Sequence, residues 1–110
     1  MIKDNQLDYT NSKQVVPALD IDWRGASTFS KTISANSVFT FSNVIDGKTL
    51  IVILKNTSGA PVSVTLPATV KWPDGSALGV SITAGKTCLY TFFYDANIGI
   101  IVGSAIEEIS

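Results

Sequence analysis

The residues of this 110-residue sequence that could act as catalysts or metal ligands do not form the combinations that such sites need. It contains no histidine, which is both the commonest metal ligand and the residue that most often exchanges protons near neutral pH. Asp20 and Asp22 lie two residues apart, so they share one face of a strand. Their carboxylates supply only part of the roughly six to eight oxygen ligands that Ca²⁺ takes, and we interpret them as a solvated strand face.

No sequence motif of a catalytic or cofactor-binding site is present either. Serine and threonine are numerous, but no histidine is available to activate them, and the chain lacks a Gly-x-Ser-x-Gly elbow. It also lacks the glycine-rich phosphate-binding loops of nucleotide-binding proteins. Cys88 is the single cysteine, and we expect it to be a small buried apolar residue. The sequence therefore predicts no enzyme, no metal site and no cofactor.

The aromatic residues are the remaining candidates for binding. Tyr90 and Tyr94 are candidates for stacking against a glycan ring, and the competing interpretation is that they belong to the core, where aromatic side chains contribute most. A strong turn motif lies at the end of the strand expected at 70–72; it consists of Trp72, Pro73, Asp74 and Gly75. We interpret it as a structural corner over which the ring of Trp72 packs.

The elements that position these residues are strands. Isoleucine, valine and threonine number 12, 10 and 11, and such stiff, branched side chains favour a pleated sheet over a helix. Asp46-Gly47 is a hairpin signal between two apolar runs. The pattern predicts an all-β fold, an antiparallel, jelly-roll-like β-sandwich of about eight or nine short strands. The expected segments are 19–23, 28–34, 38–42, 48–56, 62–66, 70–72, 80–82, 87–94 and 98–102, with a further short strand at 106–109.

One strand is apolar on both faces, and the whole chain is rich in apolar residues. Hydrophobic residues make up 45% of the sequence and charged residues 15%, against about 25% charged in an ordinary domain. This excess suggests that a second copy of the chain covers part of the apolar surface. The strand that is apolar on both faces, residues 50–54, is either central in the sandwich or covered by that second copy. Its candidate interface residues are Leu50, Ile51, Val52, Ile53 and Leu54.

The N-terminal segment, the apolar runs and the net charge of the chain indicate its domain organisation and the kinds of partner to expect. Residues 1–16 are polar and aperiodic, so we expect a flexible N-terminal arm followed by a single domain over 17–110. No apolar leader segment is visible, which predicts synthesis in a cytoplasm without secretion. The longest aliphatic run, residues 50–54, is far shorter than the roughly 20 residues of a membrane span. A formal net charge of -1 gives no electrostatic footprint for nucleic acid.

The order of these segments resembles the small β-modules of tail fibres and other virion appendages of tailed bacteriophages. The resemblance extends from Leu19 to Val102, with the tryptophan corner as its most characteristic part. The segments that carry it are Leu19-Asp20-Ile21-Asp22-Trp23, Asn36-Ser37-Val38-Phe39-Thr40-Phe41-Ser42-Asn43, Asp46-Gly47, Val64-Thr65-Leu66-Pro67, Val70-Lys71-Trp72-Pro73-Asp74-Gly75, Ala84-Gly85 and Tyr90-Thr91-Phe92-Phe93-Tyr94-Asp95.

The resemblance implies a structural protein of the virion, commonly a homotrimer. On this basis we expect a tail-fibre or head-fibre module without enzymatic activity, attached to another virion protein through residues 1–16. A host-surface glycan is a further candidate partner. The alternative hypothesis is a carbohydrate-binding module that acts as an adhesin.

Overall fold

The computed structural model describes residues 13–15 and 19–110, and it is built almost entirely from β-strands. No α-helix, and so no helix long and apolar enough to cross a membrane, occurs within this described part. The strands are β1 (Lys13–Val15), β2 (Asp20–Asp22), β3 (Thr28–Ile33), β4 (Ser37–Val38), β5 (Thr40–Ser42), β6 (Thr49–Asn56), β7 (Val62–Thr65), β8 (Val70–Lys71), β9 (Ser81–Ile82), β10 (Thr87–Asp95) and β11 (Ile100–Ile109). The short 3₁₀ turn η2 (Pro73–Gly75) lies between β8 and β9.

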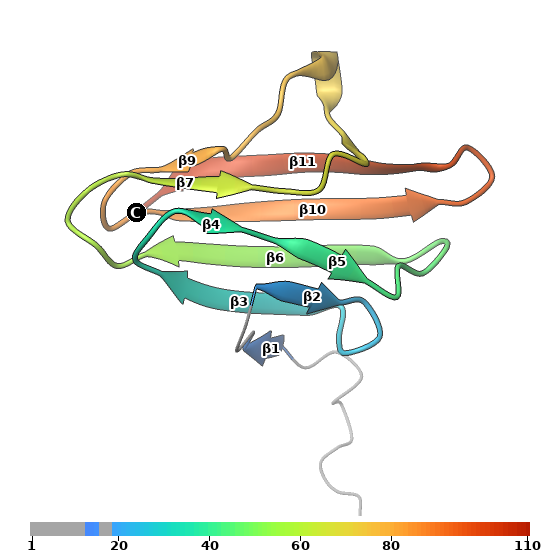
Figure 1. Ribbon diagram of the computed structural model, residues 1–110, viewed down its shortest axis with the longest axis horizontal. Coiled ribbons are helices and arrows are strands. Elements are labelled where there is room, and N and C mark those ends of the chain that lie inside the picture. Colours follow the sequence, from blue (N-terminus) through green and yellow to red (C-terminus); the bar gives the residue numbers. More distant parts are fainter. Residues whose placement is uncertain (1–12, 16–18) are drawn as a thin grey trace, which may run out of the picture.

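The strands form two layers (Figure 1). The main sheet has six strands in the order β1-β3-β6-β10-β11-β8. The second layer consists of a two-stranded sheet, β2-β5, and a three-stranded sheet, β4-β7-β9. It covers one face of the main sheet, which is the face turned toward the viewer in Figure 1. The predicted all-β sandwich is confirmed.

The pairing of the strands differs from the antiparallel arrangement that the sequence predicts. Between β2 and β10 the chain passes back and forth between the two layers, so strands that return to the same layer run in the same direction. Consequently β3 pairs with β6, β2 with β5 and β4 with β7 in parallel. The antiparallel pairs are β6 with β10, β10 with β11 and β7 with β9. The β-sandwich therefore contains both parallel and antiparallel pairs, whereas the sequence predicted an antiparallel, jelly-roll-like arrangement.

Three local expectations also need correction. Asp46-Gly47 connects β5 in the second layer to β6 in the main sheet, and these two strands do not pair, so the turn is no hairpin. The expected strand 38–42 is divided into β4 and β5 at Phe39, because β4 pairs with β7 and β5 pairs with β2. The last two expected strands form a single strand, β11, which pairs with β10 in a long hairpin containing an irregularity between Thr87 and Leu89.

The predicted arm is partly structured. Lys13–Val15 form β1, which pairs in parallel with β3 at the edge of the main sheet. The expected boundary between arm and domain therefore falls too late in the chain. The rest of the predicted arm, residues 1–12 and 16, lies outside the described residues.

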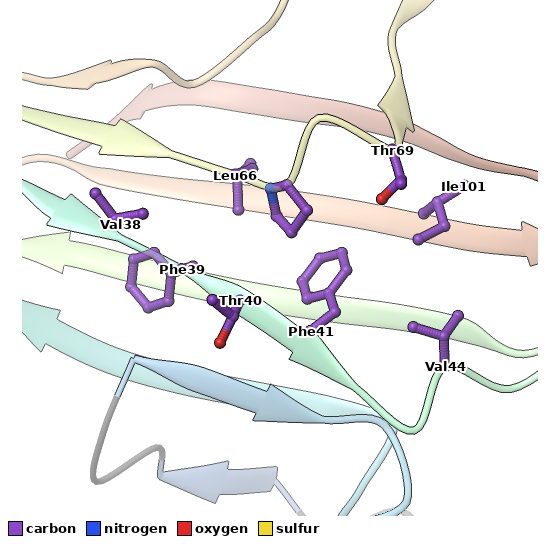
Figure 2. A pocket seen from close by; sticks show the side chains of 9 residues that line it. Val38, Phe39, Thr40, Phe41, Val44, Leu66, Thr69 and Ile101 are labelled. Atoms are coloured by element: carbon purple, nitrogen blue, oxygen red, sulfur yellow. The ribbon is translucent and has the colours of Figure 1, made fainter.

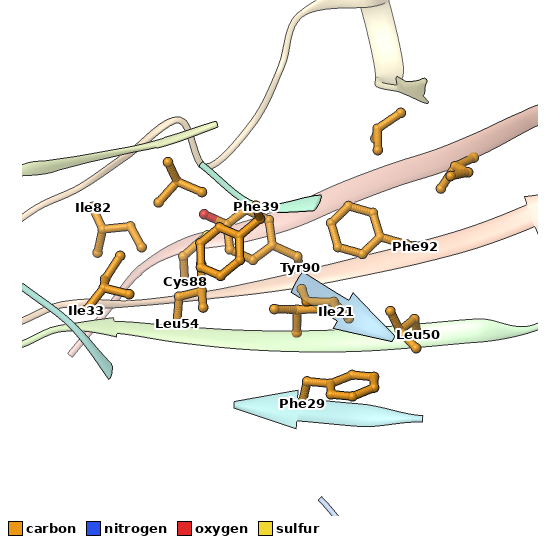
Figure 3. Packing of buried hydrophobic residues seen from close by; sticks show 14 of the residues in the cluster. Ile21, Phe29, Ile33, Phe39, Leu50, Leu54, Ile82, Cys88, Tyr90 and Phe92 are labelled. Carbon is orange, nitrogen blue, oxygen red and sulfur yellow. The ribbon is translucent and has the colours of Figure 1, made fainter. Parts of the chain in front are cut away.

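The core lies between the two layers, where alternate residues of the long strands point inward (Figure 3). Five aromatic rings form a connected row through this core, and three of them contact Phe92. Phe41 lies edge-on to Phe92 with ring centroids 5.1 Å apart, Tyr90 stacks on Phe92 at 6.0 Å, and Trp72 meets it edge-on at 6.2 Å. Trp23 extends the row by an edge contact with Phe41 at 5.5 Å. Such edge and offset geometries stabilise aromatic pairs beyond the area they bury.

Candidate functional site

The face of the main sheet that the second layer leaves uncovered is rich in apolar side chains. Along β6 and β10 buried residues alternate with partly exposed ones, as expected when only one face of a sheet is covered. No described element lies over the other face (Figure 1). We call it the open face, and define it by Ile51, Ile53, Leu89, Phe93, Val102 and Ile106.

The strand register gathers these side chains into rows across the sheet. Leu89 is the Cα partner of both Ile53 and Ile106, so three large aliphatic residues lie side by side on β6, β10 and β11. Four residues further along β10, beyond the polar pair Thr91–Ser104, Phe93 is paired with Val102. Phe93, Val102 and Ile106 are 39%, 45% and 61% exposed. A contiguous apolar surface across three strands differs from apolar residues scattered singly over a surface, and a patch of this kind often marks an interaction site.

The open face covers about half the area of a standard protein interface. The nine residues of β10 extend about 30 Å, and the three strands β6, β10 and β11 span about 14 Å. The resulting area is on the order of 400 Å², against about 800 Å² per partner in a standard interface. The rows Ile51–Thr91–Ser104 and Ile53–Leu89–Ile106 carry no charge. Charged residues lie around them: Lys55 on β6 opposite Thr87, Asp95 on β10 opposite Ile100, and Lys71 on β8 beside Val102.

The interface candidates from the sequence divide between the two faces of β6. Leu50, Val52 and Leu54 point into the core and are at most 1% exposed, so they cannot contact another chain. Ile51 and Ile53 belong to the open face. The expectation was therefore wrong for three of the five residues, because β6 is covered on one face by its own second layer.

Tyr90 cannot serve as a glycan-stacking residue. Its side chain is completely buried, its ring stacks on Phe92, and its hydroxyl donates a hydrogen bond to the carbonyl oxygen of Gly79. Burial raises the pKa of this hydroxyl, and neighbouring Cys88 adds to the effect. Tyr94 is half-buried and packs against the same core cluster. The core interpretation of the aromatic strand holds for Tyr90, and the pair forms no exposed platform.

The tryptophan corner has a structural position at the edge of the main sheet. Pro73, Asp74 and Gly75 form the exposed turn η2, in which Asp74 has a left-handed backbone with φ of 60°. The half-buried Trp72 ring contacts Phe92 of β10. This contact is possible because residue 103 of β11 is a glycine: a Cβ at Gly103 would lie 3.2 Å from Trp72 and 2.6 Å from Val70.

The two carboxylates on β2 are occupied by cross-strand hydrogen bonds. Asp20 accepts hydrogen bonds from the hydroxyls of Thr40 and Ser42, each at 2.7 Å. Asp22 accepts from the backbone N–H of Arg24 at 2.9 Å and from Asn43 at 3.2 Å, and these bonds lower its pKa. Both carboxylates stabilise the parallel β2–β5 pair. Among the described residues no group of three acidic, histidine or cysteine side chains is placed to hold a metal ion.

A groove opens in the second layer, on the side opposite the open face (Figure 2). It has a volume of about 380 Å³ and lies between β5 and the turn that follows β7. The sequence interpretation missed it, although Pro67 marks the point where β7 stops. The residues that line it are Val38, Phe39, Thr40, Phe41, Val44, Leu66, Pro67, Thr69 and Ile101.

The open face was also incompletely predicted. The sequence singled out residues 50–54, while Leu89, Phe93, Val102 and Ile106 were assigned to strands without a role. The available signal is the presence of apolar residues at both odd and even positions of β10 and β11, which indicates apolar material on two faces.

Comparisons of the chain with protein-family models, with curated proteins and with solved structures found no match.

Proposed function

We propose that the protein is a non-enzymatic structural module of a bacteriophage virion appendage, a tail or head fibre, which assembles as a homotrimer through its open face. The observation that carries this proposal is the uncharged row Ile53–Leu89–Ile106 across the uncovered side of the main sheet. Burying such a row removes apolar area from water at about 25 cal/mol per Å². Three copies arranged with their open faces toward a common axis would cover all three faces at once, as closed symmetric assemblies do.

The motif order from Leu19 to Val102 supports the assignment to a virion, which is the location we propose for the assembled protein. The alternative, a carbohydrate-binding adhesin, depended on exposed aromatic residues. Its candidate Tyr90 is buried, so the structural role is the better supported of the two hypotheses.

The oligomeric state tests the proposal directly. Light scattering and sedimentation equilibrium at micromolar concentration should give the mass of three chains. Phe93 and Ile106 are exposed in the single chain, so Phe93→Glu combined with Ile106→Glu should leave the fold intact. The double variant should be monomeric, because the trimer would bury unpaired carboxylates at a cost of several kcal/mol.

The matched control is Val38→Glu combined with Val80→Glu, which adds the same two charges at residues 61% and 50% exposed outside the open face. This variant should remain trimeric. A wild-type chain that is monomeric at micromolar concentration would refute the oligomer, and a double variant that remains trimeric would refute the open face as its interface.

We further propose that the N-terminal residues attach the module to another virion protein. Because Lys13–Val15 form β1, a clean test removes residues 1–12 alone. The truncated protein should keep its oligomeric state and melting temperature but fail to enter particles. Incorporation of the truncated protein into virions would contradict this attachment.

A further inference from the structure

The groove in the second layer adjoins an unpaired strand edge. β5 pairs with β2 and with no other strand of the described residues. On the β2 side, the N–H of Thr40 donates to Leu19 and the carbonyl of Ser42 accepts from Trp23, each at 3.0 Å. Backbone groups of successive residues in a strand point to opposite edges. The N–H and C=O of Phe41 therefore point away from β2, toward the groove.

Proline 67 creates this free edge. The parallel β4–β7 ladder ends with the N–H of Phe39 donating to the carbonyl of Thr65 at 2.8 Å. In a parallel ladder the next bond would run from the N–H of residue 67 to the carbonyl of Phe39. Pro67 has no N–H, and a turn closed by the N–H of Val70 on the Pro67 carbonyl, at 3.1 Å, then takes the chain away to the main sheet. The second layer is left one strand short beside β5.

The surroundings of the gap are apolar and uncharged. The Phe41 ring lies between β5 and the turn after β7, and Ile101 of the main sheet lies deeper in the gap (Figure 2). The hydroxyl-bearing residues Thr40 and Thr69 are its polar lining. None of the nine lining residues carries a charge. The volume of about 380 Å³ falls in the range of sites that hold a ligand, about 300–1,000 Å³.

We infer that the groove receives an extended, uncharged segment of a different polypeptide, which pairs with the free edge of β5 as an added strand. The occupant is assigned by its chemistry: residues 1–12 of this chain carry Lys3, Asp4 and Asp8, which an uncharged lining does not match. An extended backbone supplies partners for the carbonyl of Phe39 and for the N–H and C=O of Phe41. Small branched side chains at alternate positions of the added strand fit the apolar floor of the groove. A charged inward side chain would find no partner among the lining residues and would be rejected.

The inference does not depend on the oligomeric state, because the groove and the open face lie on opposite sides of the sandwich. The probe is a capped seven-residue peptide of alternating valine and threonine with a lysine at each end. Added to the ¹⁵N-labelled protein up to about 1 mM, a concentration suited to weak binding, it should shift the amide signals of Phe41 and Thr69. It should also slow hydrogen exchange of the Phe41 amide by at least about tenfold, because that amide gains a partner.

Two controls separate strand pairing from simple apolar binding. The same peptide with its two central backbone nitrogens methylated loses hydrogen bonds on both edges and should bind at least about tenfold more weakly. Thr69→Arg, at an exposed residue of the groove lining, should lower the affinity of the probe by a similar factor. Thr65→Arg, on β7 outside the lining, should leave the affinity unchanged.

Four results would overturn the inference. They are the absence of any shift at Phe41, equal binding of the methylated peptide, equal loss of affinity in the Thr65 and Thr69 variants, and displacement of the probe by a synthetic peptide of residues 1–12. The last result would assign the groove to the N-terminal residues of this chain in place of a different polypeptide.

Discussion

The hydroxyl of Tyr90 donates a 2.6 Å hydrogen bond to the carbonyl oxygen of Gly79, and the Tyr90 ring fills the space that a side chain at residue 79 would need. The N–H of Gly79 in turn donates to the carboxylate of Glu107 at 2.5 Å. One glycine of the β8–β9 connection is thus held by both strands of the β10–β11 hairpin. Its backbone has φ of +67°, a left-handed conformation that favours glycine.

Gly79→Ala should therefore be strongly destabilising. The new methyl group would overlap the ring of Tyr90 and the sulfur of Cys88, which adds an overpacking cost to that of the left-handed backbone, for a total of about 2–4 kcal/mol. The control is Gly85→Ala, where φ is +75° but nothing lies within 4 Å, so only the backbone cost of about 1 kcal/mol applies. Chemical denaturation of both variants checks this, and equal losses of stability would contradict it.

Tyr90→Phe should destabilise the protein near neutral pH, with an effect that fades in alkali. Removing the hydroxyl leaves the carbonyl of Gly79 without its partner, at a cost of about 1–3 kcal/mol. Because burial raises the pKa of Tyr90 in the folded protein, the unfolded chain alone ionises as the pH rises past about 10, and wild-type stability falls there. The variant lacks this loss. Denaturation curves from neutral pH to about pH 11 should show the two stabilities converging, and parallel curves would contradict the assignment.

Asn56→Asp should lower the free energy of unfolding at neutral pH, and it should lower it by a smaller amount in acid. Asn56 is completely buried and donates from its side-chain nitrogen to the carbonyls of Ala60 and Ile82, at 2.7 and 2.9 Å. A carboxylate there would face two carbonyl oxygens, at a cost of about 3–5 kcal/mol. Burial would raise its folded pKa above the unfolded value of about 3.9, so the penalty shrinks as the pH falls toward that value.

The control for this variant is Asn36→Asp, because the exposed Asn36 uses its side-chain oxygen to accept from Ser63 at 2.8 Å. An aspartate keeps that acceptor, so its stability should stay within about 0.5 kcal/mol of wild type. Thermal melts of both variants at neutral and acidic pH test the difference. A similar cost for the two substitutions would show that Asn56 is not the buried donor described above.

Trp72→Ala should cost about 3 kcal/mol, the lower end for removal of a large core aromatic residue, because the ring is only half-buried. The loss comes from its contact with Phe92 and from the space left beside Gly103. Pro73→Ala, in the exposed turn, is the matched control and should cost less than about 1 kcal/mol. If both variants melt together with wild type, the corner does not close this edge of the sheet.

The sequence by itself determined where the strands lie. Branched residues, period-two alternation and turn residues identified β3, β6, β7 and β10 to within a residue or two, because these signals are local. The tertiary structure decided which strands pair and which face each residue occupies. Alternation separates Leu50, Val52 and Leu54 from Ile51 and Ile53 but does not say which set is covered. That choice depends on contacts between distant segments: the chain crosses between layers, pairs β3 with β6 in parallel and covers one face of the main sheet only. The burial of Tyr90 and the gap beside β5 follow from the same long-range packing, which no local pattern encodes.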